Sequence, residues 1–279
     1  MAKILVVGCG DLGSEVIRLL ANAGHDLFGV RRSAKALPNK RAAIQADVTN
    51  LSSLSSLEML FPNVVIYCVS ANAQTDDSYK AQYVDGLSNV LLTQKQNKAL
   101  QHVFFVSSTR VYGQATDIVL NESIPAMPND FGGKRLLEAE SLLKALPCGG
   151  TAIRLAGIYG PGRLYLVNMA KDLSRWPKTN KWTNRIHRDD AAGFITFLCQ
   201  KVLAGDEVSD CYIGADDQPS KQYEVLSWLA QQMDVPVPNG IDALPSGGKR
   251  LSNQRLHDVG FQLTYPNYQQ GYQEVLKDV

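Results

Sequence analysis

Three glycines close to the start of the chain have the spacing of a phosphate-binding loop. Gly8, Gly10 and Gly13 form a GxGxxG pattern between an apolar run and a helical pattern. In such a loop the first glycine permits a tight turn, the second lets a pyrophosphate approach the backbone, and the third lets the helix pack closely. Asp11 and Leu12 add backbone amides at the start of the helix, where phosphate is favoured. We predict that these five residues bind a dinucleotide; a turn that serves only packing would not require three glycines at this spacing.

Two arginines predict which dinucleotide is bound. Arg31 and Arg32 follow the second predicted strand, where an NAD-selective site usually has an acidic residue for the ribose 2′-hydroxyl. Arginine pairs with a phosphate, which a carboxylate would repel. NADP(H) is therefore favoured over NAD(H). The alternative is a solvated basic turn, because Lys35, Lys40 and Arg41 are close in sequence.

Two further positions at strand ends are candidates for cofactor contacts. Asp47 follows the third predicted strand, where its carboxylate could contact an adenine amino group or cap the next helix. Val69 follows the fourth strand and precedes the small residues Ser70 and Ala71, which are consistent with close approach of a cofactor.

These residues must be positioned by alternating strands and helices. Apolar runs predict strands at 4–7, 26–30, 42–46, 64–68, 103–106 and 151–155, and helical spacing predicts helices at 12–23, 50–60, 77–98, 130–146 and 190–199. Such alternation indicates an α/β fold with a doubly wound parallel sheet. Ligands bind such sheets at the carboxyl ends of the strands, where the candidate residues lie.

Composition narrows the class of protein further. The chain has 279 residues, of which 45% are hydrophobic and 20% charged, with a net charge of +1, so it has no general attraction to nucleic acid. Five cysteines without a CxxC pair favour reduced thiols and a cytoplasmic location. No apolar stretch approaches the length of a membrane span, and the four histidines lack paired ligand spacing. We expect no membrane association and no metal site.

Several motifs in order resemble one superfamily. The glycine loop is followed by Ser107-Ser-Thr-Arg-Val-Tyr-Gly113, a helix led by Lys134, Arg154-x-x-Gly-Ile-Tyr-Gly-Pro-Gly-Arg163, and Ile186-His-x-Asp-Asp190. This order is similar to the extended short-chain dehydrogenase/reductase superfamily, specifically the NAD-dependent epimerase/dehydratase family, which acts largely on nucleotide sugars. The resemblance covers about residues 3 to 200 and continues more weakly in 251–256 and 260–261.

The resemblance implies a domain organisation and partners. It implies a Rossmann domain over 1–155, completed by about 185–217, and a small C-terminal substrate-binding lobe formed by 156–184 and 218–279. It also implies a small-molecule substrate, and a homodimer that forms through the helices near 77–98 and 130–146.

The resemblance also implies a catalytic set. Ser108 matches the family's serine or threonine that hydrogen-bonds the substrate oxygen, although it could instead be a turn residue. Lys134, with Glu138 four residues later, matches the lysine that binds the nicotinamide ribose; a surface pair with Asp130 or Glu138 is the alternative. Asp130 then stands at the family's tyrosine position.

An aspartate at this position changes the chemistry. Its pKa begins at about 3.9 rather than the tyrosine's value of about 10, and a neighbouring lysine would lower it further, so it is a poor match for proton transfer with an alcohol. Asp130 is instead suited to capping its helix. Tyr112 could replace the missing phenol or could be a substrate-side or packing residue.

The sequence leaves two hypotheses for the function. The first is an NADP(H)-dependent oxidoreductase or epimerase acting on a nucleotide sugar or similar hydroxyl or carbonyl compound. The second is a non-catalytic NADP(H)-binding sensor or partner-binding protein.

Four polar residues of the predicted lobe are candidates for substrate binding: Tyr159, Arg163, Arg185 and His187. The arginines could hold a diphosphate or carboxylate. His187 could instead orient the turn before the next helix through a backbone hydrogen bond.

Overall fold

A seven-stranded sheet organises the structure, a computed structural model that describes residues 1–33, 35–38, 43–114, 116–238 and 244–277. The strand order is β11-β7-β5-β4-β1-β2-β3. The strands are β1 (Lys3–Val7), β2 (Asp26–Arg31), β3 (Ile44–Gln45), β4 (Val64–Tyr67), β5 (His102–Ser108), β7 (Gly149–Leu155) and β11 (Cys211–Gly214). The β3-β2-β1-β4-β5 neighbours pair in parallel. The predicted α/β Rossmann fold is confirmed.

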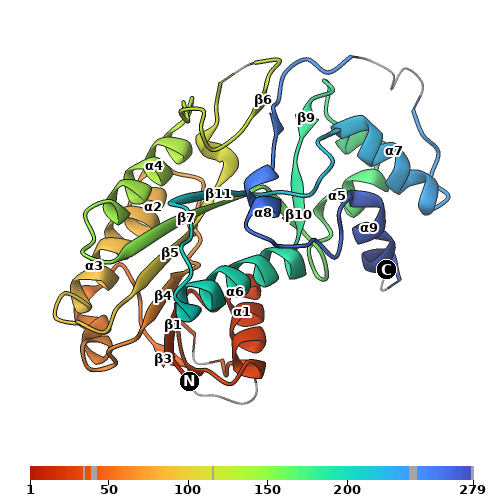
Figure 1. Ribbon diagram of the computed structural model, residues 1–279. Coiled ribbons are helices and arrows are strands. Elements are labelled where there is room, and N and C mark those ends of the chain that lie inside the picture. Colours follow the sequence, from red (N-terminus) through yellow and green to blue (C-terminus); the bar gives the residue numbers. More distant parts are fainter. Residues whose placement is uncertain (34, 39–42, 115, 239–243, 278–279) are drawn as a thin grey trace. The chain divides into compact units, whose positions relative to one another are not determined.

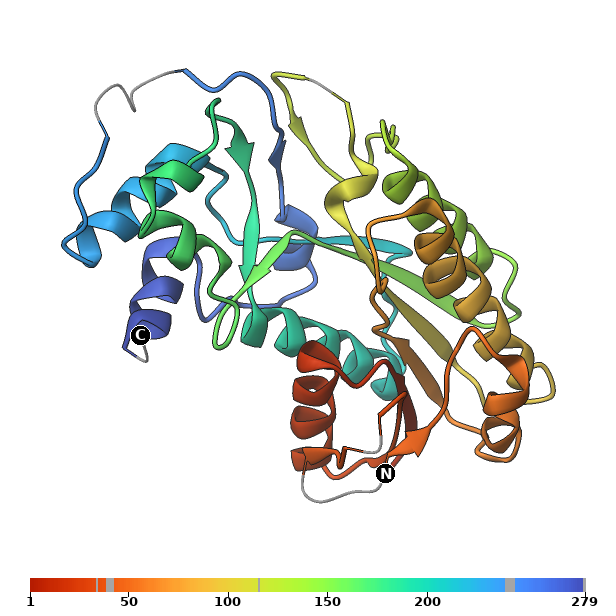
Figure 2. The ribbon, with the colours of Figure 1, turned by 180° about the vertical axis from the view of Figure 1, so that it is seen from behind.

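Helices cover both faces of this sheet. Figures 1 and 2 show α1 (Asp11–Asn22) and α6 (Arg188–Ala204) on one face, and α2 (Asp76–Tyr79), α3 (Gly86–Thr93) and α4 (Phe131–Leu143) on the other. Two 3₁₀ helices, η2 (Leu51–Met59) and η4 (Thr109–Val111), complete the connections. The sheet interior is apolar: the residues of β4 from Val64 to Tyr67 have no exposed surface.

The long helix predicted over 77–98 differs from the observed structure. It is divided by a π-helical segment, η3 (Lys80–Asp85), and α3 ends at Thr93. The carbonyl of Gln82 in this segment accepts a hydrogen bond of 2.5 Å from the Tyr67 hydroxyl. The residue after this segment, Gly86, has to be a glycine, because a Cβ there would lie 2.4 Å from the same hydroxyl. A buried phenol from the sheet therefore determines how this helix winds.

The chain divides into two compact units. Unit 1 comprises Met1–Gly113, Ala126–Arg154 and Ala192–Tyr212, and unit 2 comprises Gln114–Pro125, Leu155–Ala191 and Ile213–Val279. In unit 2 three short strand pairs join β8 (Gly157–Tyr159) to β10 (Arg185–His187), β9 (Trp182–Thr183) to β12 (Ser220–Lys221), and β6 (Val119–Leu120) to β13 (Arg250–Leu251). Its helices are α5 (Tyr165–Ala170), η5 (Leu173–Arg175), α7 (Gln222–Gln232), α8 (Gln254–Asp258) and α9 (Tyr268–Leu276).

Unit 2 has its own apolar core. Tyr159, Tyr268 and Tyr272 are buried in it together with apolar side chains of α5, α7 and α9. Tyr159 stacks on Tyr272 with ring centroids 4.3 Å apart.

In the described ranges we find no helix with the length and apolar character that crossing a bilayer requires.

Candidate functional site

The glycine loop joins β1 to α1, and each of its glycines meets a different constraint. Gly8 has a φ of +94°, and a Cβ there would lie 2.7 Å from the backbone of Cys68 at the end of β4. At Gly13 a Cβ would lie 2.4 Å from the Gly8 carbonyl oxygen, so the helix packs directly on the turn. At Gly10 a Cβ would meet no atom within 4 Å among the described residues. The loop is therefore tight at its ends and open at its centre.

Helix α1 begins without a side-chain cap. Gly10 occupies the N-cap position and has no side chain to accept from the first-turn amides, whereas α4 is capped by Asp130 and α9 by Asn267. The amides of Asp11, Leu12 and Gly13 therefore lie at a helix N-terminus whose partial positive charge favours an anion. This end of α1 has the form of a phosphate site.

A pocket of about 250 Å³ opens beside this loop. Its lining comes from the carboxyl ends of neighbouring strands: Gly8, Cys9 and Gly10 after β1; Val30, Arg31, Arg32 and Ser33 at β2; Ala46 and Val48 after β3; and Cys68, Val69 and Ser70 after β4, with Gln82 from η3. Glycines, small residues and two arginines thus surround one hollow, which is the arrangement a dinucleotide needs.

The two arginines of the pocket differ in exposure. Arg32 is exposed and Arg31 is half-buried. Nη1 of Arg31 donates to the Lys35 carbonyl at 3.4 Å, while its buried Nε has no hydrogen-bond partner among the described residues. A buried donor without a partner is unfavourable, and a phosphate would satisfy it. Lys40 and Arg41, the other residues of the basic turn, lie outside the described residues.

Asp47 binds its own turn. Its Oδ1 accepts from the Thr49 backbone amide at 2.9 Å and the Thr49 hydroxyl at 2.8 Å. The amide hydrogen bond and nearby Arg32 hold the pKa of the Asp47 carboxyl below its usual range. The cap of the next helix is Asn50, whose side chain accepts from Ser52. A contact with adenine would have to use the remaining acceptor capacity of Asp47.

Ser108 ends β5 and caps the short helix that follows. Its hydroxyl oxygen accepts from the Arg110 amide at 3.2 Å, and its side chain is half-buried. Ser108 therefore does stabilise the turn after its strand, which was the alternative to substrate binding. Because a hydroxyl can accept and donate together, this turn still leaves the Ser108 proton for a ligand.

Behind Ser108 lies a buried ion pair that sequence reasoning missed. Glu140 on α4 and Arg154 on β7 are 8% and 9% exposed, and Nη2 of Arg154 lies 2.7 Å from Oε2 of Glu140. Ser107 donates to Glu140 at 2.6 Å, and Nη1 of Arg154 donates to the Tyr112 hydroxyl at 2.7 Å. Burial lowers the pKa of Arg154, but the Glu140 carboxylate outweighs burial and holds it above its usual range. This cluster joins β5, α4 and β7.

Tyr112 belongs to this cluster. It is 1% exposed, and the Arg154 guanidinium lies 5.0 Å from its ring centroid. The packing role considered for it therefore fits better than replacement of a catalytic phenol. Glu140 rather than Glu138 is the buried glutamate of α4, since Glu138 is exposed and pairs with Arg135 at 2.8 Å.

Asp130 is both a helix cap and one half of an ion pair. Its Oδ1 accepts from the Gly133 amide at 2.8 Å, and both carboxylate oxygens lie 3.0 Å from Nε of Arg110. Partial burial raises the pKa of Asp130, but the hydrogen bonds from Gly133 and Arg110 outweigh burial and place it below its usual range. A carboxylate held in this way is a weak base.

Lys134 lies one turn into α4 and is exposed. Its two expected surface partners are engaged elsewhere: Asp130 pairs with Arg110, and Glu138 pairs with Arg135. Within the described part of the chain, the Lys134 ammonium has no ion-pair partner. It is therefore available to a ligand.

The four predicted substrate residues lie in unit 2, and three of them are buried. Tyr159, Arg185 and His187 are 3%, 3% and 1% exposed, and Arg163 is half-buried. Nδ1 of His187 accepts from the Asp189 amide at 3.2 Å, which is the backbone hydrogen bond that the sequence left as an alternative. Their burial indicates a structural contribution to unit 2.

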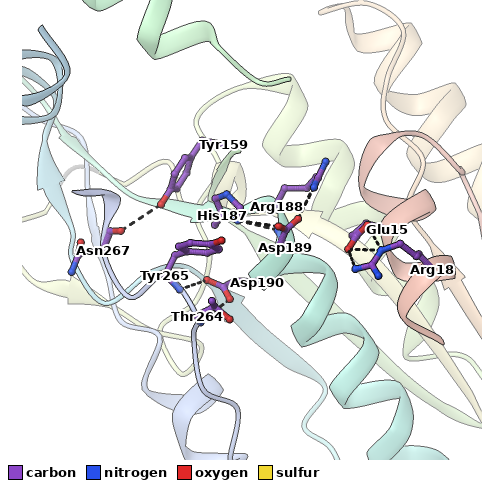
Figure 3. A network of polar contacts seen from close by, with 10 residues as sticks. All are labelled: Glu15, Arg18, Tyr159, His187, Arg188, Asp189, Asp190, Thr264, Tyr265 and Asn267. Carbon is purple, nitrogen blue, oxygen red and sulfur yellow. Dashed lines mark hydrogen bonds and ion pairs between the residues drawn. The ribbon is translucent and has the colours of Figure 1, made fainter. Parts of the chain in front are cut away.

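Asp190 anchors the same region of unit 2. Figure 3 shows its carboxylate accepting from the amides of Thr264 and Tyr265, at 2.8 and 2.9 Å. The rings of His187 and Tyr265 lie 4.0 Å apart. The Asp190 hydrogen bonds and this ring contact attach the start of α6 to the segment that contains Thr264 and Tyr265.

None of the described residues forms a cluster of His, Cys, Asp and Glu that could hold a metal ion.

A parallel sheet in this order, with a glycine-rich turn between its first strand and helix, defines a Rossmann-type protein. The model of the NAD dependent epimerase/dehydratase family matches residues 4–214, and the chain belongs to this family. No curated protein matches the chain.

Solved structures agree with this assignment. A provisionally named NAD-dependent epimerase/dehydratase from Methylobacillus flagellatus is 45% identical, with a TM-score of 0.89 over 99% of this chain and 98% of that chain. Two more distant structures show the fold alone. UDP-glucose 4-epimerase of Thermus thermophilus, solved with NAD, is 16% identical with a TM-score of 0.79 over 99% and 98% of the two chains. The Bordetella bronchiseptica enzyme WbmG, solved with NAD and UDP, is 18% identical with a TM-score of 0.79 over 98% and 92%.

Proposed function

We propose that the chain binds NADP(H) and acts as an oxidoreductase or epimerase on a nucleotide sugar or a similar hydroxyl or carbonyl compound. Family membership supports a nicotinamide dinucleotide cofactor. The observation that carries the choice of NADP(H) is the pocket beside the glycine loop, where Arg31 and Arg32 line the wall next to β2. The unpaired Nε of Arg31 is suited to a 2′-phosphate.

The roles of individual residues follow from their places. The amides of α1 would hold the pyrophosphate, and Val69 and Asp47 would border the adenosine. When bound, the cofactor supplies or accepts hydride. Ser108 would hold the substrate oxygen, and Lys134 would bind the nicotinamide ribose. We further propose that unit 2 contributes the substrate-binding lobe, over 156–184 and 218–279, and that the chain forms the homodimer implied by the family resemblance.

A second function is favoured by the state of Asp130. This carboxylate is occupied by Arg110 and by the Gly133 amide, and Tyr112 is buried. A protein that binds NADP(H) without redox turnover, as a sensor or partner-binding module, would not need a phenol at this position.

Turnover separates the two functions. Two kinds of turnover should be measured with a panel of nucleotide sugars and related carbonyl compounds: net NADPH oxidation, which reports an oxidoreductase, and inversion of a substrate carbon by NMR, which reports an epimerase without net oxidation of the cofactor. Ser108→Ala is the variant, and Ser141→Ala, on the exposed face of α4, is the matched control. Turnover that Ser108→Ala abolishes and Ser141→Ala retains supports the enzyme. Tight NADPH binding without turnover across the panel supports the sensor.

A further inference from the structure

The Arg110 guanidinium lies at the first turn of α4 and is held on several sides. Its Nε contacts both oxygens of Asp130, and its Nη1 donates to the Tyr79 hydroxyl at 2.6 Å and to Oε1 of Gln74 at 2.8 Å. Its Cζ lies 4.9 Å from the Tyr79 ring centroid and 5.1 Å from that of Phe131. Aromatic faces and charged hydrogen bonds together fix the orientation of this cation.

The backbone of α4 leaves room for this arrangement. A Cβ at Gly132 would lie 2.5 Å from Cζ of Arg110, so a residue with a side chain would displace the guanidinium. Arg110, Asp130 and Gly132 therefore form one unit. This unit occupies the helix start where the sequence motifs place the family's tyrosine.

One nitrogen of Arg110 is left over. Nη2 has no hydrogen-bond partner in the described part of the chain, and it is not among the unpaired atoms that are buried. It is therefore accessible to solvent. A guanidinium whose other nitrogens are fixed presents this last pair of N–H donors in a set direction, so little entropy is lost when it binds.

The carboxylates near Arg110 are already engaged by other groups. Asp130 neutralises Arg110 and also caps α4, where its Oδ1 accepts from Gly133. Lys134 lies one turn further on the same face and adds a second cation. A second carboxylate, Asp76, lies close enough to Arg135 and Lys134 for both cations to lower its pKa, but its two oxygens accept from Arg135 at 2.8 Å. Both carboxylates are therefore engaged by other groups, and Nη2 of Arg110 and the Lys134 ammonium are left for an anion near a helix N-terminus.

This place is separate from the phosphate site of the glycine loop. Arg110 follows β5, and β4 lies between β5 and β1. Two strand spacings amount to about 10 Å. Both places are at the carboxyl ends of strands, where this fold binds its ligands.

We propose that Arg110 binds an anionic oxygen of a ligand, a carboxylate or a phosphate, through Nη2, with Lys134 as the second cation. If this anion site is part of the substrate site, it rests on the proposed function, because it would then bind an anionic group of the substrate close to Ser108. As an anion site it does not depend on turnover or on the identity of the dinucleotide.

The test is a titration of the full chain followed by NMR of ¹⁵N-labelled arginine side chains. Sodium phosphate and sodium acetate are added in separate arms at constant ionic strength, with chloride as the balancing anion. The Arg110 signal is identified by its loss in Arg110→Lys, and Arg135, whose side chain is partly exposed on α4, is the internal control. We expect a saturable shift of the Arg110 signal, with affinity weakened about fivefold in Lys134→Gln. The arm with the tighter binding identifies the group as phosphate or carboxylate.

Three results would overturn the proposal. The first is no saturable shift of Arg110 with either anion, and the second is an equal shift of Arg135, which would indicate general screening. The third is loss of the anion when NADPH is added in excess, because the site would then belong to the dinucleotide. Failure of NADPH to bind would instead refute the proposed function and leave the anion site standing.

Discussion

Replacing Arg154 by methionine should destabilise unit 1 by about 3–5 kcal/mol, because it leaves a buried carboxylate without its cation. The Glu140 side chain is 9% exposed, and after the change it would keep only the 2.6 Å hydrogen bond from Ser107. The Tyr112 hydroxyl would also lose its donor. Replacing both charges, in Arg154→Met with Glu140→Leu, should cost less than Arg154→Met alone, since no buried charge remains.

Urea unfolding monitored by circular dichroism measures these differences. The matched control is Lys201→Met, which breaks the exposed pair between Lys201 and Asp206, with an N–O distance of 2.9 Å and exposed fractions of 28% and 54%. This control should cost no more than about 1 kcal/mol. The reasoning is refuted if Arg154→Met costs as little as the control, or if the double variant is destabilised by the sum of both single changes.

Two other predictions concern the glycine loop and a buried acid. Gly13→Ala should lower the free energy of unfolding by about 1–3 kcal/mol, because its methyl group would overlap the Gly8 carbonyl. Gly10→Ala should keep the stability and weaken dinucleotide binding, because its methyl group enters the open centre of the loop. Equal thermal stability of the two variants would contradict this prediction. Burial raises the pKa of Asp216 to about 7 from 3.8, so the folded state holds this proton more tightly and the carboxyl costs stability as pH rises from 3.8 through 7. Asp216→Asn should therefore gain about 2–3 kcal/mol relative to the unmodified chain between pH 5 and pH 8, and a constant difference across this range would show that Asp216 titrates normally.

The local parts of the fold could be predicted from sequence because each depends on neighbouring residues. The strand before Gly8 and the helix after Gly13 follow from apolar spacing and glycine spacing, and the order of strands and helices gives the sheet. The π-helical segment could not be predicted, because it depends on the Tyr67 hydroxyl, which lies 15 residues away from Gln82.

The glycine loop of the candidate site has a local sequence pattern, whereas the ion pairs beside Ser108 join residues that are far apart in the sequence. Arg110 and Asp130 are 20 residues apart, and Glu140 and Arg154 are 14 apart on different elements, so no local pattern connects either pair. Residue type alone also does not predict exposure: Arg185, a candidate for substrate binding by its type, is 3% exposed. One signal was available in the sequence, because Arg110 lies inside the serine motif and Asp130 lies where the resemblance predicts the family's tyrosine, so opposite charges stand in two parts of one expected site.

The most direct test of cofactor choice is equilibrium binding of NADPH and NADH, measured by calorimetry on the unmodified chain and on Arg31→Asp. Lys98→Asp is the matched control, because Lys98 precedes β5 and so lies near the amino-terminal ends of the strands, whereas the pocket lies at their carboxyl ends. We expect that NADPH binds more tightly than NADH, that Arg31→Asp erases or reverses the difference, and that Lys98→Asp preserves it. Equal affinities in the unmodified chain, or a preference for NADH, would contradict this expectation.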